Sequence, residues 1–229
     1  MRTKALNIDC MDFMAGLPDN AYELAIVDPP YGLGGRVVNS CGRFKGYYNN
    51  NGNWDEEPPS QNYFTELFRV SKNQIIWGGN YFNLPPNRCF LIWDKKQPEG
   101  ISFGMAEYAW ASFNSVSKVF YQFSSHVTQG KRIHPTQKPI ALYRWLLTNY
   151  AKPGDRILDT HLGSGSSRIA AEELGFEFVG CELDEDYYND QEKRFNAWYA
   201  QGNLFREEQS TEKTEQISIF DYGKAAVSK

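Results

Sequence analysis

An acid, two prolines and an aromatic residue follow one short apolar run of the chain. Asp28, Pro29, Pro30 and Tyr31 come directly after the apolar residues 24–27. The run is too short for a core helix and ends where the prolines remove two backbone donors, so it predicts a buried strand. Ligands bind at the carboxyl ends of strands in open α/β sheets. The residue types therefore suit a site with a hydrogen-bonding carboxylate and a stacking ring, although an ordinary strand-ending turn would use the same residues.

A second group of polar and small residues lies between a predicted strand at 155–159 and a predicted helix at 166–174. Its members that could contact a ligand are Asp159, His161, Gly163, Ser164 and Gly165. Glycines let the backbone approach a ligand closely and direct amide groups at it. Glu182, after the next predicted strand, is placed to accept hydrogen bonds from ribose hydroxyls. Because the dinucleotide fingerprint and the phosphate loop are both absent, the pattern favours a nucleoside cofactor without a pyrophosphate, such as S-adenosylmethionine; a helix start that needs only small residues is the alternative.

Strands and helices alternate along the chain. Strands are predicted at 4–8, 23–27, 74–77, 89–93, 155–159 and 176–181. Helices are predicted at 61–70, 138–150 and 166–174, and Asp184 can cap a final long helix. A further pair of strands, 106–113 and 116–123, is predicted to form a hairpin. This alternation favours a three-layer α/β sheet.

Length and composition predict a single domain. The chain has 229 residues, of which 41% are hydrophobic and 15% aromatic, enough to bury a sizeable core. We expect residues 1–202 to form this domain and the polar tail 203–229 to be disordered. The segment 32–60 is rich in glycine and asparagine and directly follows the four residues Asp28–Tyr31, called the tetrad below. We therefore expect a mobile flap there, or else a plain disordered loop.

Several classes of protein are disfavoured by the sequence. No apolar stretch approaches the length of a membrane span, and the amino terminus lacks the apolar core of a signal peptide, so we expect a soluble, cytoplasmic protein without a membrane partner. The four cysteines form no CxxC pair and there are only three histidines, which argues against a disulfide framework and a metal site.

The charge of the chain is distributed unevenly. The net charge is −4 and the pI is about 5.5, but no acidic residue occurs between Tyr31 and Asp55 or between Glu107 and Asp155. The basic residues in these stretches that could contact nucleic acid are Arg36, Arg43, Lys45, Lys131 and Arg132. A polyanion lying over one face would explain the asymmetry, and chance combined with solvated helix faces is the alternative.

Taken together, the motifs resemble those of a known family. The tetrad, the segment His134–Pro139 (HPTQKP), the loop 159–165 and Glu182, in this order, resemble the β-class amino-methyltransferases of DNA. The resemblance spans about residues 5–200. Further short segments, Trp77-Gly78-Gly79-Asn80 and Ile92-Trp93-Asp94-Lys95, are similar to the small phage and prophage adenine methyltransferases. One departure is His161, where the family usually has phenylalanine, and it bears on how the cofactor is packed.

The resemblance implies a fold and a set of site residues. The fold is a three-layer Rossmann-like S-adenosylmethionine-dependent methyltransferase domain, with a mostly parallel seven-stranded sheet and a circularly permuted motif order. The implied cofactor-binding residues are Asp9, Cys10, Thr136, Lys138, Asp159, His161, Gly163, Ser164, Gly165 and Glu182. Among them Asp9 is implied to lie near the cofactor adenine, and Thr136 and Lys138 near its methionine end. Residues 97–132 correspond to a short target-recognition insertion, in which Lys131 and Arg132 would contact phosphates or a guanine edge.

The resemblance also implies an activity. Asp28 and the Pro29 carbonyl would accept hydrogen bonds from the N6 amine of an adenine flipped out of double-stranded DNA, and Tyr31 would stack on the base. The alternatives are N4-cytosine methylation, methylation of a glutamine amide or RNA, and a catalytically inactive DNA-binding regulator. Family members that act on cytosine more often begin the tetrad with serine, so Asp28 favours adenine. A monomer or homodimer in a bacterial or phage-infected cell, serving restriction-modification or phage DNA methylation, would fit this activity.

Overall fold

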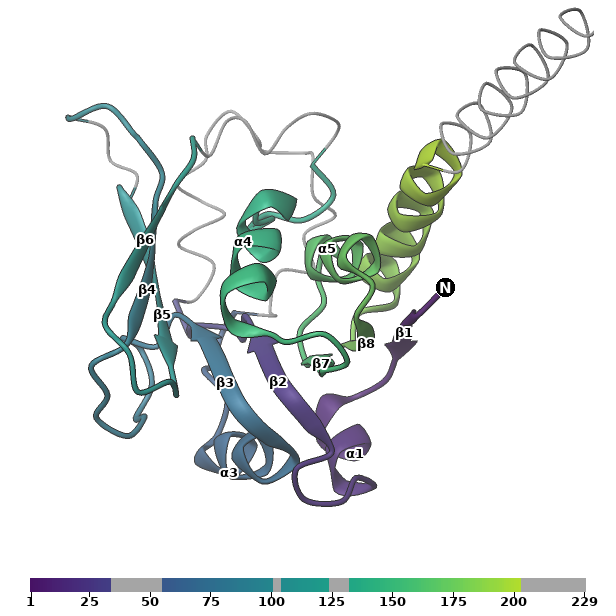
Figure 1. Cartoon of the computed structure of the whole chain (residues 1–229), viewed down its shortest axis with the longest axis horizontal. Coiled ribbons are helices and arrows are strands. Elements are labelled where there is room, and N and C mark those ends of the chain that lie inside the picture. The colour runs from purple at the N-terminus through teal and green to yellow at the C-terminus, as the bar shows by residue number, and fades with distance from the viewer. Residues whose placement is uncertain (34–54, 101–103, 124–131, 203–229) are drawn as a thin grey trace, which may run out of the picture. The chain divides into compact units, whose positions relative to one another are not determined.

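The computed structural model describes residues 1–33, 55–100, 104–123 and 132–202 (Figure 1). The chain divides into two compact units, residues 1–192 and 193–229, whereas the sequence predicts one domain up to residue 202. All the labelled strands and helices belong to the first unit. Most of the predicted flap 32–60 and the whole predicted tail 203–229 lie outside the described residues.

Unit 1 is built on one mixed sheet, in the order β1-β8-β7-β2-β3-β5-β4-β6. The strands are β1 (Thr3–Asn7), β2 (Tyr22–Val27), β3 (Ser71–Trp77), β4 (Phe90–Asp94), β5 (Ala106–Ala111), β6 (Lys118–Tyr121), β7 (Arg156–Asp159) and β8 (Glu177–Glu182). The strands from β1 to β3 in this order are mutually parallel, β5 is antiparallel to β3 and β4, and β6 is parallel to β4. The predicted mostly parallel α/β fold is confirmed, with eight strands rather than seven in the described part of the chain.

The predicted hairpin at 106–113 and 116–123 is wrong. β5 pairs with β3 on one side and β4 on the other, and β6 pairs with the far side of β4, so β4 separates the two strands. The physical reason is burial, because Ala109, Trp110 and Ala111 all lie in the core. A strand in the interior of a sheet pairs its backbone on both edges, and the short apolar pattern does not reveal which partners it takes.

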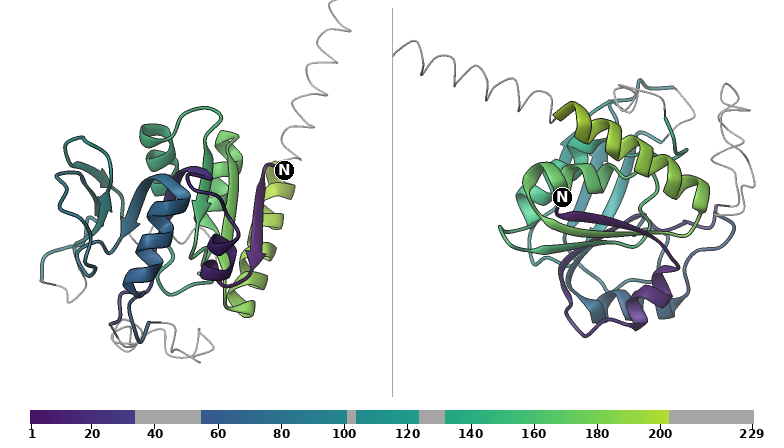
Figure 2. Two further views of the ribbon diagram at one scale, coloured as in Figure 1. Left: turned by 90° about the horizontal axis from the view of Figure 1, so that it is seen from below. Right: turned by 90° about the vertical axis from the view of Figure 1, so that its right-hand side faces the viewer.

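Within the described residues, the four labelled helices cover the two faces of the sheet. They are α1 (Cys10–Ala15), α3 (Gln61–Val70), α4 (Ile140–Tyr150) and α5 (Ser166–Leu174). Figure 2 shows α1 and α3 on one face and α4 and α5 on the other, which gives the three predicted layers. Residues 185–192 are helical as well, and the Asp184 carboxylate caps their start by accepting from the Tyr187 amide at 3.0 Å.

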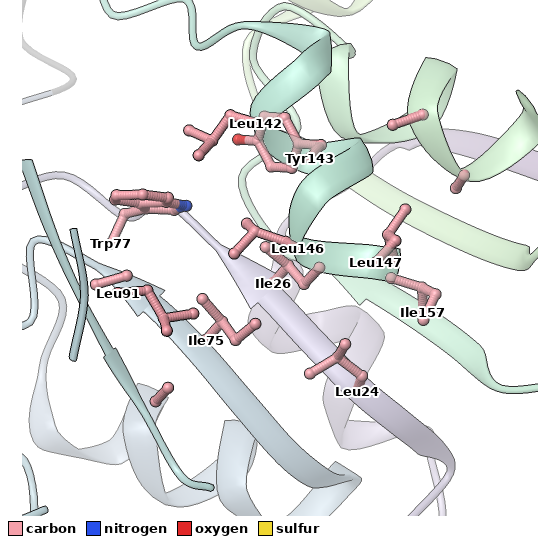
Figure 3. Packing of buried hydrophobic residues seen from close by; sticks show 14 of the residues in the cluster. Leu24, Ile26, Ile75, Trp77, Leu91, Leu142, Tyr143, Leu146, Leu147 and Ile157 are labelled. Carbon is pink, nitrogen blue, oxygen red and sulfur yellow. The ribbon is translucent and has the colours of Figure 1, made fainter. Parts of the chain in front are cut away.

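β2 lies in the middle of the sheet and is buried on both faces. Its alternate residues point to opposite sides. Ile26 packs in a core with Leu146 of α4 (Figure 3), and Val27 packs in a second core with Phe64 of α3. Each such side chain contributes about 1.5–3 kcal/mol by burial. The strand is therefore held firmly, and the tetrad that follows it begins from a fixed position.

Candidate active site

The carboxylate of Asp28 is held by two donors where β2 ends. Its Oδ1 accepts a hydrogen bond from the Tyr31 hydroxyl at 2.7 Å, and its Oδ2 pairs with the Lys138 ammonium. Lys138 precedes α4, and its side chain is only 2% exposed. Burial, together with the nearby Asp28, raises the pKa of Tyr31 well above its usual value, so the phenol stays a hydrogen-bond donor. The tetrad and the 134–139 segment thus form one site.

Lys138 also contacts a second carboxylate, that of Glu107 on β5. Lys138 Nζ lies 3.2 Å from Glu107 Oε2, and Lys95 Nζ lies 2.6 Å from Glu107 Oε1. Burial alone would raise the pKa of Glu107, but the two lysines outweigh it and bring the pKa to about 2. Burial would likewise lower the pKa of Lys138, but Asp28 and Glu107 raise it above its usual value. The four side chains form a row in which basic and acidic groups alternate.

Glu107 reaches this edge of the sheet because β5 is antiparallel to its neighbours. The first residues of β5 lie beside the last residues of β4, and Glu107 pairs with Trp93. Neither Glu107 nor Lys95 was predicted as a site residue from the sequence. The one available signal was that Glu107 is the last acid before the long acid-free stretch, which by itself does not indicate a site.

The backbone and ring of Tyr31 are fixed by residues that are distant in sequence. The amides of Tyr31 and Gly32 donate to Asp55 Oδ1 at 2.7 and 3.0 Å. The Tyr31 ring stacks on the Tyr81 ring, with centroids 5.0 Å apart and planes 16° from parallel. Gly78 lies against the same ring: a Cβ there would come within 2.2 Å of Tyr31 Cε1, and φ is +68°. Only glycine fits at this position. Asp55 and Tyr81 were not predicted as site residues.

Glu182 attaches the loop 159–165, called the glycine loop below, to the end of β8. Glu182 Oε2 accepts from the Gly163 amide at 2.7 Å, and Oε1 accepts from the Asp184 amide at 3.0 Å. His134 covers the loop, since a Cβ on Gly163 would lie 3.6 Å from its ring. Thr136 Oγ1 lies 3.1 Å from Nδ1 of the same histidine. The HPTQKP segment and the glycine loop, which are separate in the sequence, are therefore in contact.

Two further loop residues start α5. Gly165 is its N-cap and has φ of +71°, a left-handed conformation that favours glycine. The Ser164 hydroxyl is buried and lies 3.2 Å from the Ser166 hydroxyl. The loop is thus held in place by the contact between the two serine hydroxyls and by a glycine at the position where its backbone is left-handed.

Asp159 is used inside the loop. Its side chain is buried, and it accepts from the His161 amide at 3.0 Å and from the Ser167 hydroxyl at 2.6 Å. Burial raises the pKa of Asp159 to about 7, in spite of the two donors, which lower it. The structure gives Asp159 a role in shaping the loop, and its direct contact with a cofactor stays a prediction.

Replacing Asp159 with asparagine is expected to alter the pH dependence of stability. The folded protein holds this proton up to a pH of about 7, whereas the ordinary pKa of aspartate is 3.8. Tighter proton binding by Asp159 therefore stabilises the folded protein fully below pH 3.8, and this stabilisation is lost as the pH rises to 7. Relative to the wild type, Asp159→Asn should gain on the order of 3 kcal/mol of unfolding free energy across this window. The free energy of unfolding is measured by urea unfolding at several pH values. Asp155→Asn is the control and should show the same pH dependence as the wild type. If the free energies of the wild type and Asp159→Asn changed in parallel with pH, the prediction would be contradicted.

The predicted residues Asp9, Cys10 and His161 gather near Glu182 at the ends of β1, β7 and β8. Asp9 caps α1 by accepting from the Met11 amide at 2.7 Å. Burial raises the pKa of Cys10 to about 12, with Asp9 adding to the effect, so Cys10 remains a thiol. Burial lowers the pKa of His161 to about 4, so its ring is neutral at pH 7.

His161 occupies a place where its ring is used as an aromatic group. It packs edge-on against Tyr63, with centroids 5.4 Å apart, and its Nδ1 lies 2.9 Å from Thr160 Oγ1. A neutral, half-buried imidazole in this setting resembles the phenylalanine that the family usually has. The departure noted in the sequence is therefore compatible with the packing of the loop.

The predicted DNA contacts are only partly within the described residues. Arg36, Arg43, Lys45 and Lys131 lie outside them, and Arg132 is described and half-buried. The range 97–132 contains β5 and β6, which are strands of the main sheet. Its role in target recognition stays a prediction.

The described residues contain no group of three or more His, Cys, Asp or Glu side chains that could hold a metal ion. None of the helices in this part of the chain combines the length and apolar character needed to cross a bilayer.

The sheet order, with an acidic tetrad after β2 and a glycine loop after the adjacent β7, defines a Rossmann-like methyltransferase fold. Residues 77–193, slightly more than half of the chain, match the family model described as DNA methylase, of the N6 and N4 type. The chain belongs to this DNA methylase family.

Named relatives agree with the family. YubD of Escherichia coli (strain K12), whose name describes it as a methylase, is 26% identical over 218 residues, covering 82% of this chain and 88% of YubD. The type II methyltransferase M.HinfI of Haemophilus influenzae is 25% identical over 241 residues, covering 81% of this chain and 66% of M.HinfI.

Solved structures show the same fold. The complex of M1.HpyAVI with SAM has a TM-score of 0.57 at 18% identity, covering 85% of this chain and 99% of that one. The PvuII DNA methyltransferase, which is cytosine-N4-specific, has a TM-score of 0.59 at 13% identity, covering 84% and 86%. Since the second of these acts on cytosine, the fold does not distinguish the two target bases.

Proposed function

We propose that the protein transfers a methyl group from S-adenosylmethionine to the N6 amine of an adenine flipped out of double-stranded DNA. The observation that carries the proposal is the Asp28 carboxylate, fixed by Tyr31 and Lys138 at the sheet edge where the glycine loop also lies. Membership of the DNA methylase family supports it.

The glycine loop fits the nucleoside part of such a cofactor. Each carboxylate oxygen of Glu182 accepts one backbone amide and retains a further lone pair, which suits the two hydroxyls of a ribose. Gly163 and Gly165 have positive φ values, which favour glycine, and as glycines they have no side chain that would narrow the loop. The SAM complex of M1.HpyAVI shares this fold, which supports the same choice. When bound, S-adenosylmethionine supplies a methyl group that is bonded to a positively charged sulfur. After the transfer the rest of the cofactor is released as a neutral thioether.

The tetrad is suited to hold an amine whose lone pair is delocalised into a base. Asp28 and the Pro29 carbonyl would accept hydrogen bonds from its two N–H groups. This favours a pyramidal nitrogen whose lone pair is free to attack the methyl group. Pro29 is buried and has a fixed φ, so its carbonyl position is constrained. Once the nitrogen has gained the methyl group it is cationic, and its N–H bond breaks with the proton passing to Asp28 or to water. Tyr31, one face of which already stacks on Tyr81, would offer its opposite face to the base and offset part of the few kcal/mol lost on unstacking.

N4-cytosine methylation is the second candidate, because the chemistry is the same and the PvuII enzyme shares the fold. Asp28 at the first position of the tetrad favours adenine. The similarity to the type II enzyme M.HinfI supports a role in restriction-modification.

One assay decides among these functions. The full chain is incubated with labelled S-adenosylmethionine and duplex DNA, and the DNA is then digested to nucleosides. We expect label in N6-methyladenine. Label in N4-methylcytosine would establish the second candidate, and unlabelled DNA with cofactor still bound would favour an inactive DNA-binding protein.

A further inference from the structure

Asp28 is already engaged at both oxygens in the structure. Oδ1 accepts from the Tyr31 hydroxyl and Oδ2 pairs with the Lys138 ammonium. The proposed function, on which this inference rests, requires the same carboxylate to accept a hydrogen from the base amine. That amine becomes cationic as it gains the methyl group. An ammonium held on Oδ2 would compete for the acceptor and repel the developing charge.

Lys138 has a second carboxylate to which it can move. Glu107 Oε2 is 3.2 Å from Lys138 Nζ, so the two already form an ion pair at the long end of hydrogen-bonding distance. The Lys138 side chain is almost completely buried, so it cannot turn to water instead. Its ammonium also lies 5.3 Å from the Trp77 ring centre and 6.0 Å from that of Tyr31, and aromatic faces stabilise a cation.

Glu107 is in turn held by Lys95. Lys95 Nζ lies 2.6 Å from Glu107 Oε1, which leaves Oε2 directed at Lys138. A buried cation with two carboxylates within reach can shift from one to the other without losing its pairing. A short displacement of one ammonium group is therefore sufficient to free Oδ2 of Asp28, while Oδ1 keeps the Tyr31 hydroxyl.

We propose that Glu107 is a positioning residue that draws Lys138 away from Asp28 when the base amine arrives. Lys138 pairs mainly with Asp28 in the free protein and with Glu107 once the amine occupies Asp28. Glu107 touches neither the base nor the methyl group and acts through Lys138.

A double-mutant cycle between Glu107 and Lys138 tests the proposal. Single-turnover rates are measured at saturating cofactor and DNA for the wild type, Glu107→Gln, Lys138→Met and the double variant. Glu107→Gln leaves Lys138 on Asp28, so we expect the rate to fall about tenfold, equivalent to about 1.4 kcal/mol. In the Lys138→Met background the same substitution should change the rate by less than about twofold. A Glu107 residue that only supports the fold would slow both backgrounds.

Two further measurements separate this role from a structural one. The cofactor dissociation constant, measured by titration calorimetry, should be unchanged in Glu107→Gln. Glu107→Asp keeps a charge that can attract Lys138 and should recover most of the lost rate. Glu173→Gln is the matched control, because it breaks an ion pair with Arg144 between α4 and α5, away from the site.

The outcomes distinguish this proposal from the function on which it rests. A wild-type protein that does not methylate DNA overturns the proposed function. A wild type that methylates, with Glu107→Gln equally fast, overturns the positioning role alone. Slowing by Glu107→Gln in the Lys138→Met background also overturns it, and this comparison remains available if the single variant Glu107→Gln does not fold.

Discussion

Replacing Asp28 with asparagine is expected to abolish methyl transfer while cofactor binding persists. The variant keeps the shape of the side chain but loses the charge that pairs with Lys138 and would orient the amine. Loss of one preorganised group that contacts the reacting atoms costs about a hundredfold or more in rate. Asp28→Ala should have the same effect. Single-turnover methylation and calorimetric titration with the cofactor measure the two quantities on one preparation.

Asp19→Asn is the matched control for this variant. Asp19 is an exposed partner of Arg69, so its loss removes an aspartate charge without touching the site. Its rate should equal that of the wild type. Asp28→Asn could instead lose cofactor affinity and keep its rate at saturating cofactor. In that case the tetrad would belong to the cofactor site, and the proposed role of Asp28 in orienting the amine would be wrong.

Replacing Glu182 with alanine is expected to have the opposite effect. The variant loses the proposed acceptor of the ribose hydroxyls and the acceptor of the Gly163 amide. Charge-assisted hydrogen bonds contribute about 1.5–3 kcal/mol each, so the cofactor dissociation constant should rise by about tenfold to a hundredfold. The rate at saturating cofactor should change much less. Titration calorimetry and a cofactor-concentration series measure both.

Two comparisons sharpen the Glu182 result. Glu182→Gln retains a carbonyl oxygen for the Gly163 amide, so it should lie between the wild type and Glu182→Ala. Glu177→Ala removes an exposed glutamate from the other end of the same strand and should bind the cofactor normally. An unchanged affinity in Glu182→Ala would contradict the assignment of the nucleoside site.

Local patterns were sufficient to predict most of the elements. The helix predicted at 61–70 has these bounds in the structure, because its apolar residues recur at helical spacing and bury one face. The strand before the tetrad was equally clear, because a short run of β-forming residues ends at two prolines. In both segments the residues that determine the structure are neighbours in the chain.

The contacts within the site were harder to predict, because they depend on pairing between distant segments. The place of Lys138 at the methionine end of a cofactor stays a prediction, and its pairing with Asp28 was not predicted. Glu107 enters the site only because β5 lies between β3 and β4, an order that the expected hairpin did not include. Asp55 has no local signal either, since its role is to accept amides from Tyr31 and Gly32.

The antiparallel direction of β5 has a consequence for how such a protein can diverge. Parallel strands contribute the residues that follow them to this edge of the sheet, whereas β5 contributes Glu107 from its own beginning. Its register is set by pairing on both sides, independently of the connection between β4 and β5. Lys95, a member of the charged row, directly follows β4, so insertions or deletions in that connection after Lys95 would leave the row in place. The length of that part of the connection can therefore change without altering the chemistry beside it.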